Sequence, residues 1–238
     1  MDDIGVRFNR NRARRKRRAQ PNSVPSALLS GYGNPMPHGF RSSPLMLSGL
    51  ILMIAGFALW RLAPELDLTL LMAFRLDPAS PAVPAIRGLT MLGGLALLAP
   101  FALVAAAGLA LRGDRWRALW LVLTVASGRL AVEAAKLICA RGRPPLAGRL
   151  DDVSSPSFPS AHAAGTLLVW LALTMLFDRQ RRVLLPATVA MAAAIGWTRL
   201  ALGVHWPGDV LAGFGLALLW AGLAERWLPP ARAPINRA

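Results

Sequence analysis

Two histidines lie among basic residues in a pattern that suits the binding and transfer of a phosphoryl group. Lys136 precedes Arg143 by seven residues, and Arg199 precedes His205 by six. Lysine and arginine neutralise the charge on phosphate oxygens, and arginine offers a planar fork that matches two of them. Phosphoryl transfer depends mainly on such positioning and neutralisation. These residues therefore indicate an anion site, with His162 as a second titratable group.

The two histidines can divide the chemistry between them. A neutral imidazole can attack phosphorus as a covalent nucleophile, and a carboxylate can fix its tautomer and stabilise the resulting cation. Asp209 follows His205 by four residues and is the natural orienting group for it. His162 can protonate the leaving oxygen and later activate water. His38, the third histidine, lies in a polar leader and takes no part in this interpretation.

The residues before His162 are typical of a helix start that binds an anion. Pro159 and Ser160 precede an apolar run, and the first-turn amides of a helix are free to donate to a bound anion. The Ser160 hydroxyl and the backbone amide of Ala161 are therefore predicted phosphate ligands beside the basic residues.

Metal ligands are scarce near these residues. Asp151 and Asp152 form an adjacent acidic pair, but too few other carboxylates accompany them to build a two-metal site. Cys139 is the single cysteine, which excludes an internal disulfide and a thiolate metal cluster. We therefore expect metal-independent chemistry with no cofactor.

Helices that cross a membrane must position these residues. The chain has 238 residues and is 55% hydrophobic, yet its net charge is +15, so apolar and basic residues are segregated as in membrane proteins. Six apolar stretches approach the ~20 residues that a membrane-spanning helix needs. They lie at approximately 45–62, 88–111, 118–139, 162–177, 183–201 and 209–228. The expected fold is an all-α bundle of about six transmembrane helices.

Polar segments flank this bundle. Residues 1–43 are basic and contain Gly and Pro, which predicts a disordered cytoplasmic tail. Residues 44–230 are the predicted transmembrane domain that carries the phosphoryl-transfer residues, and 231–238 form a second cytoplasmic tail. The basic leader could contact nucleic acid or anionic headgroups. We favour a solvated tail that holds the N-terminus in the cytoplasm, and we expect no nucleic-acid partner, because no DNA-binding fold follows it.

The segment between the first two spans, residues 63–87, is too polar to cross a membrane. It mixes Leu68 and Phe74 with Glu65 and Asp67, which makes it amphipathic enough to form a small interfacial helix. It could line a lipid entrance or be an ordinary surface connector, and the sequence favours neither.

Charge asymmetry predicts the orientation in the membrane. With the basic leader in the cytoplasm, the arginine-rich loops 112–117 and 178–182 fall on the same side. The loops 63–87, 140–161 and 202–208 then lie on the extracytoplasmic face. The three segments with the chemical residues thus meet at one face, although charge alone assigned the topology. We expect the inner (cytoplasmic) membrane of a bacterium, with the active site outside.

The third predicted span carries three charges, because Arg129, Glu133 and Lys136 share one helical face. Charges near the bilayer centre cost several kcal/mol, so this face should line the bundle interior or a wet cavity. Arg129 and Glu133 could simply neutralise each other. Lys136 is harder to explain structurally, because Lys16 is the only other lysine of the chain.

Taken together, the motifs resemble those of the type 2 phosphatidic acid phosphatase superfamily, which includes membrane lipid phosphatases and undecaprenyl-diphosphate phosphatases. The resemblance covers roughly residues 45–228, and the three motifs occur in the family's order. The motifs are Lys136 with Arg143-Pro144, then Pro159-Ser160-Ala161-His162, then Thr198-Arg199 with His205 and Asp209.

This resemblance implies a role for each motif residue. His205 would be the nucleophile, His162 the acid and base, and Asp209 the support of His205, while the remaining motif residues would bind phosphate. Two residues depart from the usual pattern, because Ala161 replaces Gly and Thr198 replaces Ser. Both should be tolerated, because alanine keeps the amide donor and threonine keeps the hydroxyl.

The implied activity is hydrolysis of the terminal phosphate of a lipid phosphate or prenyl diphosphate. Undecaprenyl diphosphate, phosphatidate and phosphatidylglycerol phosphate all fit. A lipid phosphotransferase is an alternative, because a phosphohistidine can pass its group to an acceptor other than water. A non-catalytic lipid-binding or transport protein is a further alternative, which the intact motifs disfavour. Soluble acid phosphatases and vanadium haloperoxidases have similar sites, but the six apolar stretches argue against both.

Overall fold

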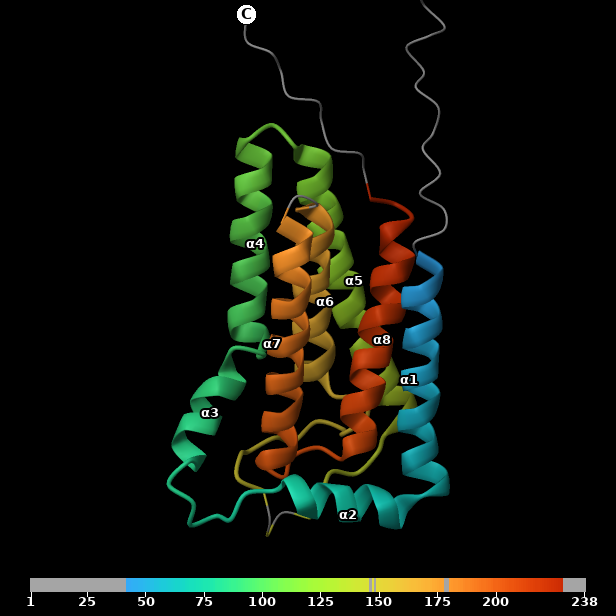
Figure 1. Cartoon of the computed structure of the whole chain (residues 1–238), viewed down its shortest axis with the longest axis vertical. Coiled ribbons are helices and arrows are strands. Elements are labelled where there is room, and N and C mark those ends of the chain that lie inside the picture. The colour runs from blue at the N-terminus through green and yellow to red at the C-terminus, as the bar shows by residue number, and fades with distance from the viewer. Residues whose placement is uncertain (1–41, 146, 148, 178–179, 229–238) are drawn as a thin grey trace, which may run out of the picture. The chain divides into compact units, whose positions relative to one another are not determined.

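The computed structural model describes residues 42–145, 147, 149–177 and 180–228, and within them every regular element is a helix (Figure 1). The helices in chain order are α1 (Ser42–Leu62), α2 (Pro64–Phe74), α3 (Val83–Met91), α4 (Leu95–Leu111), α5 (Arg115–Cys139), α6 (Ala161–Leu176), α7 (Arg181–Ala201) and α8 (Pro207–Glu225). The all-α bundle with a small helix after the first span is confirmed. The predicted tails at 1–43 and 231–238 lie outside the described residues, apart from the start of α1.

Five helical segments are long and apolar enough to cross a membrane: α1, the α3–α4 stretch Val83–Leu111, α5, α7 and α8. The sixth predicted span corresponds to α6, which has only 16 residues and a length of about 24 Å. Its residues from Ala163 to Met175 are mostly buried among the other helices. A helix enclosed by its neighbours contacts little lipid, so it does not need the full bilayer thickness.

The second predicted span begins differently from the expectation of one helix over 88–111. The chain forms α3 and α4 with a turn at residues 92–94 between them. A Cβ at Gly93 would lie 2.8 Å from the Oγ1 of Thr166 in α6, which only a glycine avoids. The turn therefore lets α3 bend over the bundle while its backbone packs against α6.

Helix α8, which carries Asp209, packs closely against α1. A Cβ at Gly49 would lie 2.6 Å from the backbone nitrogen of Leu219, and one at Gly215 would lie 2.5 Å from that of Met53. Small residues allow this approach of helix backbones, as they do in other membrane proteins. The start of α8 is thereby fixed relative to the helix that precedes α2.

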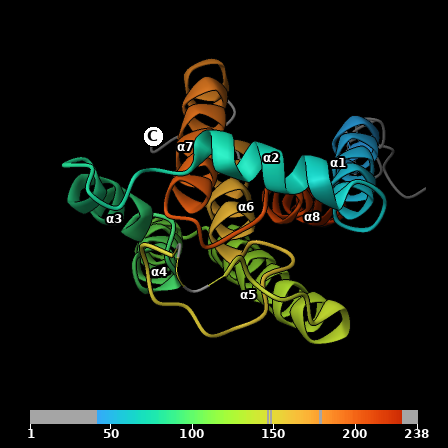
Figure 2. The same ribbon diagram turned by 90° about the horizontal axis from the view of Figure 1, so that it is seen from below.

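The three segments with the predicted chemical residues meet at one end of the bundle. In Figure 1 the α1–α2 junction, the α5–α6 connection and the α7–α8 connection all lie at the lower end, opposite the α4–α5 turn. Figure 2 shows α2 lying across this end of the bundle. The predicted clustering of the motifs at a single face of the helix bundle is therefore observed.

Candidate active site

His205 is held in the short connection between α7 and α8. Gly203 ends α7 with a positive φ of 64°, and its amide donates to the Leu200 carbonyl at 2.8 Å. This turn directs the His205 ring into the interior, where it is buried. Its Nδ1 lies 3.3 Å from Oδ2 of Asp209, in the first turn of α8. The predicted pairing of His205 with Asp209 is present.

Asp209 is oriented by local helix geometry as well as by its contacts. Pro207 begins α8, and Oδ2 of Asp209 accepts a hydrogen bond from the Trp206 amide at 2.9 Å. A carboxylate at the third helical position commonly folds back on the residue before the helix in this way. The same oxygen also accepts from the Ser157 hydroxyl, which lies 3.4 Å from Nδ1 of His205.

The other ring nitrogen of His205 faces a cation. Nη1 of Arg143 lies 3.1 Å from Nε2 of His205 and donates to the Val204 carbonyl at 2.7 Å. Burial, and then the positive charges of Arg143 and Arg199, hold the pKa of His205 well below 6.5. The imidazole is therefore neutral at neutral pH, with Nδ1–H towards Asp209 and a lone pair on Nε2.

Arg143 keeps its charge in this setting. Burial and the nearby Arg199 lower the pKa of Arg143 to about 10, which leaves the guanidinium protonated at neutral pH. Its position follows from the end of α5, where Ala140 adopts a left-handed conformation with φ 45° and turns the chain back over the bundle.

Arg199 projects from the last turn of α7 and is 1% exposed. Its Nη1 donates to Thr90 Oγ1 at 2.8 Å and to Asp151 Oδ2 at 3.3 Å. Its buried Nε has no hydrogen-bond partner within the described residues, and neither has the buried Oγ of Ser160. Buried polar atoms are normally satisfied, so these two atoms point to a polar ligand.

Lys136 contacts the protein rather than open space. Its Nζ donates to the Pro156 carbonyl at 2.6 Å and to Ser155 Oγ at 3.2 Å, next to the segment that leads into α6. Arg143 also donates to the Ser155 carbonyl, at 2.7 Å. Lys136 and Arg143 therefore both hold the segment at Ser155 and Pro156. In the same helix Arg129 pairs with Glu133 at 2.5 Å, as the neutralisation hypothesis expected.

His162 lies in the first turn of α6, directly after Ala161, and is partly exposed. Its ring makes no hydrogen bond within the described part of the chain. The turn before α4 approaches it closely, because a Cβ at Gly94 would lie 3.5 Å from Nε2 of His162. The second histidine thus lies near the site, and no hydrogen bond within the described residues fixes the direction of its ring.

Several residues at the site escaped the sequence-based prediction. Ser157 and Thr90 contact the predicted site residues directly, and Thr198 Oγ1 donates to Thr90 Oγ1 at 2.9 Å. The signal for Ser157 was its place just before the second motif. Thr90 lies 109 residues from Arg199, and no spacing rule connects them.

A chain of buried charges behind Asp209 also escaped the prediction. Arg141 pairs with Asp209 Oδ1 at 2.7 Å and with Asp67 Oδ2 at 2.5 Å. Asp67 was predicted to lie in an amphipathic interfacial segment, but its side chain is fully buried. Helix α2 therefore does more than lie at the surface, because one of its carboxylates enters the site. Arg141 itself falls between the two basic residues of the first motif.

Comparison with known proteins identifies the family of the chain. Residues 117–233 match the family model described as the PAP2 superfamily. Phosphatidylglycerophosphatase B of Bacillus subtilis is 33% identical over 140 residues, which cover 56% of this chain and 68% of that protein. Lipid A 1-phosphatase of Rhizobium etli is 31% identical over 110 residues, covering 41% of this chain and 44% of that protein.

Two further relatives extend the comparison. Decaprenylphosphoryl-5-phosphoribose phosphatase of Mycobacterium tuberculosis is 38% identical over 73 residues, covering 31% of this chain and 38% of that protein. The crystal structure of a transmembrane PAP2-type phosphatidylglycerolphosphate phosphatase from Bacillus subtilis is similar with a TM-score of 0.68 and 27% identity, covering 79% of this chain and 95% of that one. The chain therefore belongs to the PAP2 superfamily and is an integral membrane lipid phosphatase, a phosphomonoester hydrolase.

Proposed function

We propose that the protein removes the terminal phosphate of a lipid phosphate or prenyl diphosphate through a phosphohistidine formed on Nε2 of His205. The observation that carries the proposal is the environment of this ring. Oδ2 of Asp209 lies 3.3 Å from Nδ1 of His205, where it can accept a hydrogen bond, and Arg143 lies 3.1 Å from Nε2. One nitrogen is thereby oriented, and the other faces a group suited to phosphate oxygens.

In the first step the Nε2 lone pair of His205 attacks phosphorus, and the bond from phosphorus to the lipid oxygen breaks. The negative charge of a bound phosphate favours the protonated form of His162. That ring then gives its proton to the lipid oxygen, so the lipid leaves as an alcohol or, from a diphosphate, as a monophosphate. The carboxylate of Asp209 stabilises the positive charge that the ring of His205 gains.

In the second step neutral His162 takes a proton from water, and the oxygen of that water attacks the phosphorus. The bond between phosphorus and Nε2 breaks, its electron pair returns to His205, and inorganic phosphate leaves. His162 is protonated again and both rings are restored. An alcohol in place of water would make the same protein a phosphotransferase, which is the alternative outcome.

The phosphate oxygens would be held by Arg143, Arg199, Lys136, Ser160 and the amide of Ala161. Support comes from the unpartnered Nε of Arg199 and Oγ of Ser160, because a bound phosphate offers acceptors for both. The Nη1 group of Arg143, which lies 3.1 Å from Nε2 of His205 in the structure, would then donate to a phosphate oxygen instead. The described residues contain no group of three or more His, Cys, Asp or Glu side chains that could hold a metal ion. We propose a metal-independent reaction.

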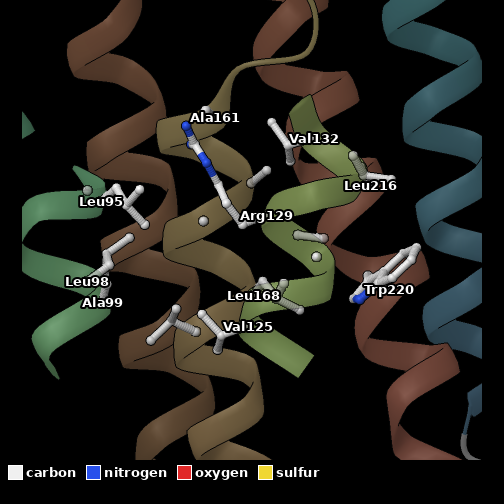
Figure 3. A pocket seen from close by; sticks show the side chains of 16 residues that line it. Leu95, Leu98, Ala99, Val125, Arg129, Val132, Ala161, Leu168, Leu216 and Trp220 are labelled. Carbon is white, nitrogen blue, oxygen red and sulfur yellow. The ribbon is translucent and has the colours of Figure 1, made fainter. Parts of the chain in front are cut away.

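An apolar pocket next to the site supports a lipid substrate. It lies between α4, α5, α6 and α8 and is lined mainly by apolar side chains (Figure 3). Leu98, Leu168 and Trp220 are among its lining residues, and Ala161 is at its upper end. Figure 3 shows the Arg129 side chain extending towards Ala161. A lipid chain in this pocket would end beside the start of α6, where Ser160 and His162 lie.

The related proteins carry names that refer to phosphatidylglycerophosphate, lipid A and decaprenylphosphoryl-5-phosphoribose. We therefore propose a lipid with a terminal phosphate and place phosphatidylglycerol phosphate, phosphatidate and undecaprenyl diphosphate as the candidates. We also propose that the active-site end faces the extracytoplasmic side of a bacterial inner membrane, because the arginine-rich turn at 112–117 lies at the opposite end of the bundle.

The substrate is tested by phosphate release from these three lipids by the purified protein in detergent, with and without a chelator. We expect release from at least one lipid and no effect of the chelator. Absence of release from all three would favour a binding protein, and inhibition by the chelator would contradict the histidine mechanism. Adding a lipid alcohol as acceptor and following its phosphorylation separates hydrolysis from phosphotransfer. Accessibility of a cysteine placed at residue 150 tests the orientation.

A further inference from the structure

We infer that Arg141 is a positioning residue for the reaction, which fixes the orientation of the Asp209 carboxylate and supplies its positive counter-charge, and is itself anchored by Asp67 of α2. The inference rests on the proposed role of Asp209 as the support of His205. Arg141 does not touch the phosphoryl group. It acts through Asp209, and so it ties a helix at the end of the bundle to the nucleophile.

The two oxygens of Asp209 have separate partners. Oδ1 accepts from Nη1 of Arg141 at 2.7 Å, while Oδ2 faces Nδ1 of His205, the Ser157 hydroxyl and the Trp206 amide. The ion pair therefore leaves all the groups around His205 on one oxygen. Rotation of the carboxylate would break the pair, so Arg141 fixes which oxygen meets the imidazole.

Arg141 is held from the far side as well. Its Nη2 donates to Oδ2 of Asp67 at 2.5 Å, and Oδ1 of Asp67 accepts from the Gly208 amide at 2.8 Å. The guanidinium also lies 5.3 Å from the ring centre of Trp60 and 5.2 Å from that of Trp206. Two carboxylates and two indole rings therefore restrict the orientation of the guanidinium.

Close packing around Gly208 supports this arrangement. A Cβ at Gly208 would lie 3.3 Å from both Nη1 of Arg141 and Oδ2 of Asp67, and 2.7 Å from the Gly56 carbonyl. A side chain at this position would therefore press on the ion pair. Because Gly208 has no side chain, Arg141 and Asp67 can lie close to the start of α8 and Arg141 can pair with Asp209.

Burial explains why a cation is required. Asp209 and Asp67 are fully buried, and Arg141 is 7% exposed. A buried carboxylate without a partner is neutralised by taking up a proton, and a neutral Asp209 could not stabilise the cationic ring of the phosphohistidine. The charged or titratable groups around Asp209 are Asp67 from α2, Lys136 from α5, Arg141 and Arg143 from the segment after α5, and His205 from the turn before α8.

A purely structural reading predicts something different. If Arg141 only fastens α2 to the bundle, its loss lowers the melting temperature but leaves turnover per folded molecule and the pH profile unchanged. If it positions Asp209, its loss lowers kcat, changes KM little and moves the acidic limb of the pH profile to higher pH, because Asp209 is protonated more easily.

The test compares Arg141→Gln, Arg141→Lys and Asp67→Asn with the control Arg61→Gln in the full chain. Arg61 is a matched control, because it also lies over the Trp60 ring, at 5.5 Å, but is exposed and pairs with neither Asp67 nor Asp209. Turnover of the lipid that the protein hydrolyses is measured against pH, together with the melting temperature and the folded fraction.

We expect Arg141→Gln to lower kcat by about 10- to 100-fold, the range known for groups that orient the ligands of a metal site, with KM changed less than about threefold. Arg141→Lys should recover part of the loss, because lysine restores the charge but not the two-edged fork. Asp67→Asn should lower kcat by a few-fold, because it keeps the ion pair between Arg141 and Asp209 and removes only the anchor of Arg141. This variant replaces Arg141→Gln in the test if Arg141→Gln does not fold. Arg61→Gln should match the native protein.

Two results would overturn the inference. The first is a folded Arg141→Gln protein with native kcat and an unshifted acidic limb, while His205→Ala is inactive. If Arg141→Gln does not fold, the same result in folded Asp67→Asn counts instead. Either result would contradict the role of Arg141 but leave the proposed function standing. Full turnover by His205→Ala would overturn the proposed function and the inference with it.

Discussion

The two histidines of the site lie in different surroundings. His205 is buried and is held on both ring nitrogens, by Asp209 at Nδ1 and by Arg143 near Nε2. His162 is partly exposed, and its ring has no hydrogen bond within the described residues. A nucleophile gains from a fixed direction of attack, because its lone pair must meet phosphorus in line. A group that moves a proton first to the lipid oxygen and then from water gains from freedom to turn.

The largest effect should come from removing the fixed ring. His205→Ala deletes the proposed nucleophile, and we expect turnover to fall by at least about 10⁴-fold, as for nucleophiles that work with a base and an orienting carboxylate. The measurement is phosphate release from lipid phosphate, together with trapping of an acid-labile phosphoenzyme. His38→Ala, a histidine outside the described residues, is the matched control. A phosphoenzyme that still forms in His205→Ala would place the nucleophile elsewhere.

Removing His162 should lower turnover by a smaller factor, and that factor should depend on the leaving group. For His162→Ala we expect turnover of a lipid phosphate to fall by about 10²- to 10⁴-fold, which is the usual range for general acid–base groups. An aryl phosphate such as p-nitrophenyl phosphate needs little protonation on leaving, so its first step should survive. The phosphohistidine should then accumulate, because no base activates water.

Rapid-quench measurement of p-nitrophenol and of phosphoenzyme checks this directly. A burst of p-nitrophenol followed by slow turnover is the expected result in His162→Ala. Equal losses for aryl and lipid phosphates, without any burst, would mean that the two rings are not divided into nucleophile and proton carrier.

The positive charge of Arg143 near Nε2 should affect the pH at which His205 can act as a nucleophile. His205 must be neutral to attack, and burial and Arg143 hold its pKa well below 6.5, so its contribution to kcat/KM should persist below pH 6.5 and fail only at lower pH. Arg143→Gln removes one positive charge, which lets the pKa of His205 rise towards 6.5. The acidic limb should therefore move to higher pH in the variant.

This prediction is checked by the pH dependence of kcat/KM between pH 4 and 8 in native protein and in Arg143→Gln. Arg149→Gln is a suitable control, because Arg149 lies in the same segment but donates to the carbonyls of Pro144 and Val153. An acidic limb that stays in place, or moves to lower pH, would contradict the assigned effect of Arg143 on His205.

The smallest effect should come from Ser157, which helps to hold Asp209. Ser157→Ala removes one hydrogen bond to a carboxylate, worth about 1.5 kcal/mol, and this corresponds to about tenfold in kcat. The Trp206 amide and Arg141 continue to hold Asp209. Thr69→Ala is the control, because the exposed Thr69 hydroxyl donates only to the Glu65 carbonyl within its own helix α2. A Ser157→Ala protein with native kcat would show that the remaining contacts suffice to fix the His205 side of the site.

Local sequence signals predicted that His205 lies beside Asp209 and that His162 lies at the start of a helix. His205 and Asp209 are four residues apart, and a helix start between them brings their side chains together. Ser160 and Ala161 were placed correctly at the start of α6, because the proline before them and the apolar run after them mark a helix N-terminus. The roles assigned to these residues stay predictions until the variants are measured.

The limits of prediction appear in the contacts of Lys136 and Asp67. The sequence predicts Lys136 as a phosphate ligand but not the hydrogen bonds that its ammonium donates to Pro156 and Ser155 in the structure. Asp67 was predicted at an interface and is buried. The hydrophobic pattern around each residue describes its own helix, but not the loop or helix that lies above it.

The sequence by itself determined the apolar helices, the family motifs and the chemistry that they suggest, because each depends on residue types at short spacing. Only the tertiary structure decided that Arg141 joins Asp209 to Asp67, across 68 and 74 residues of chain. It also decided that Thr90 supports Arg199. These partners meet because α2, α3 and the segment after α5 fold over the same end of the bundle, and no local spacing encodes how separate helix ends converge.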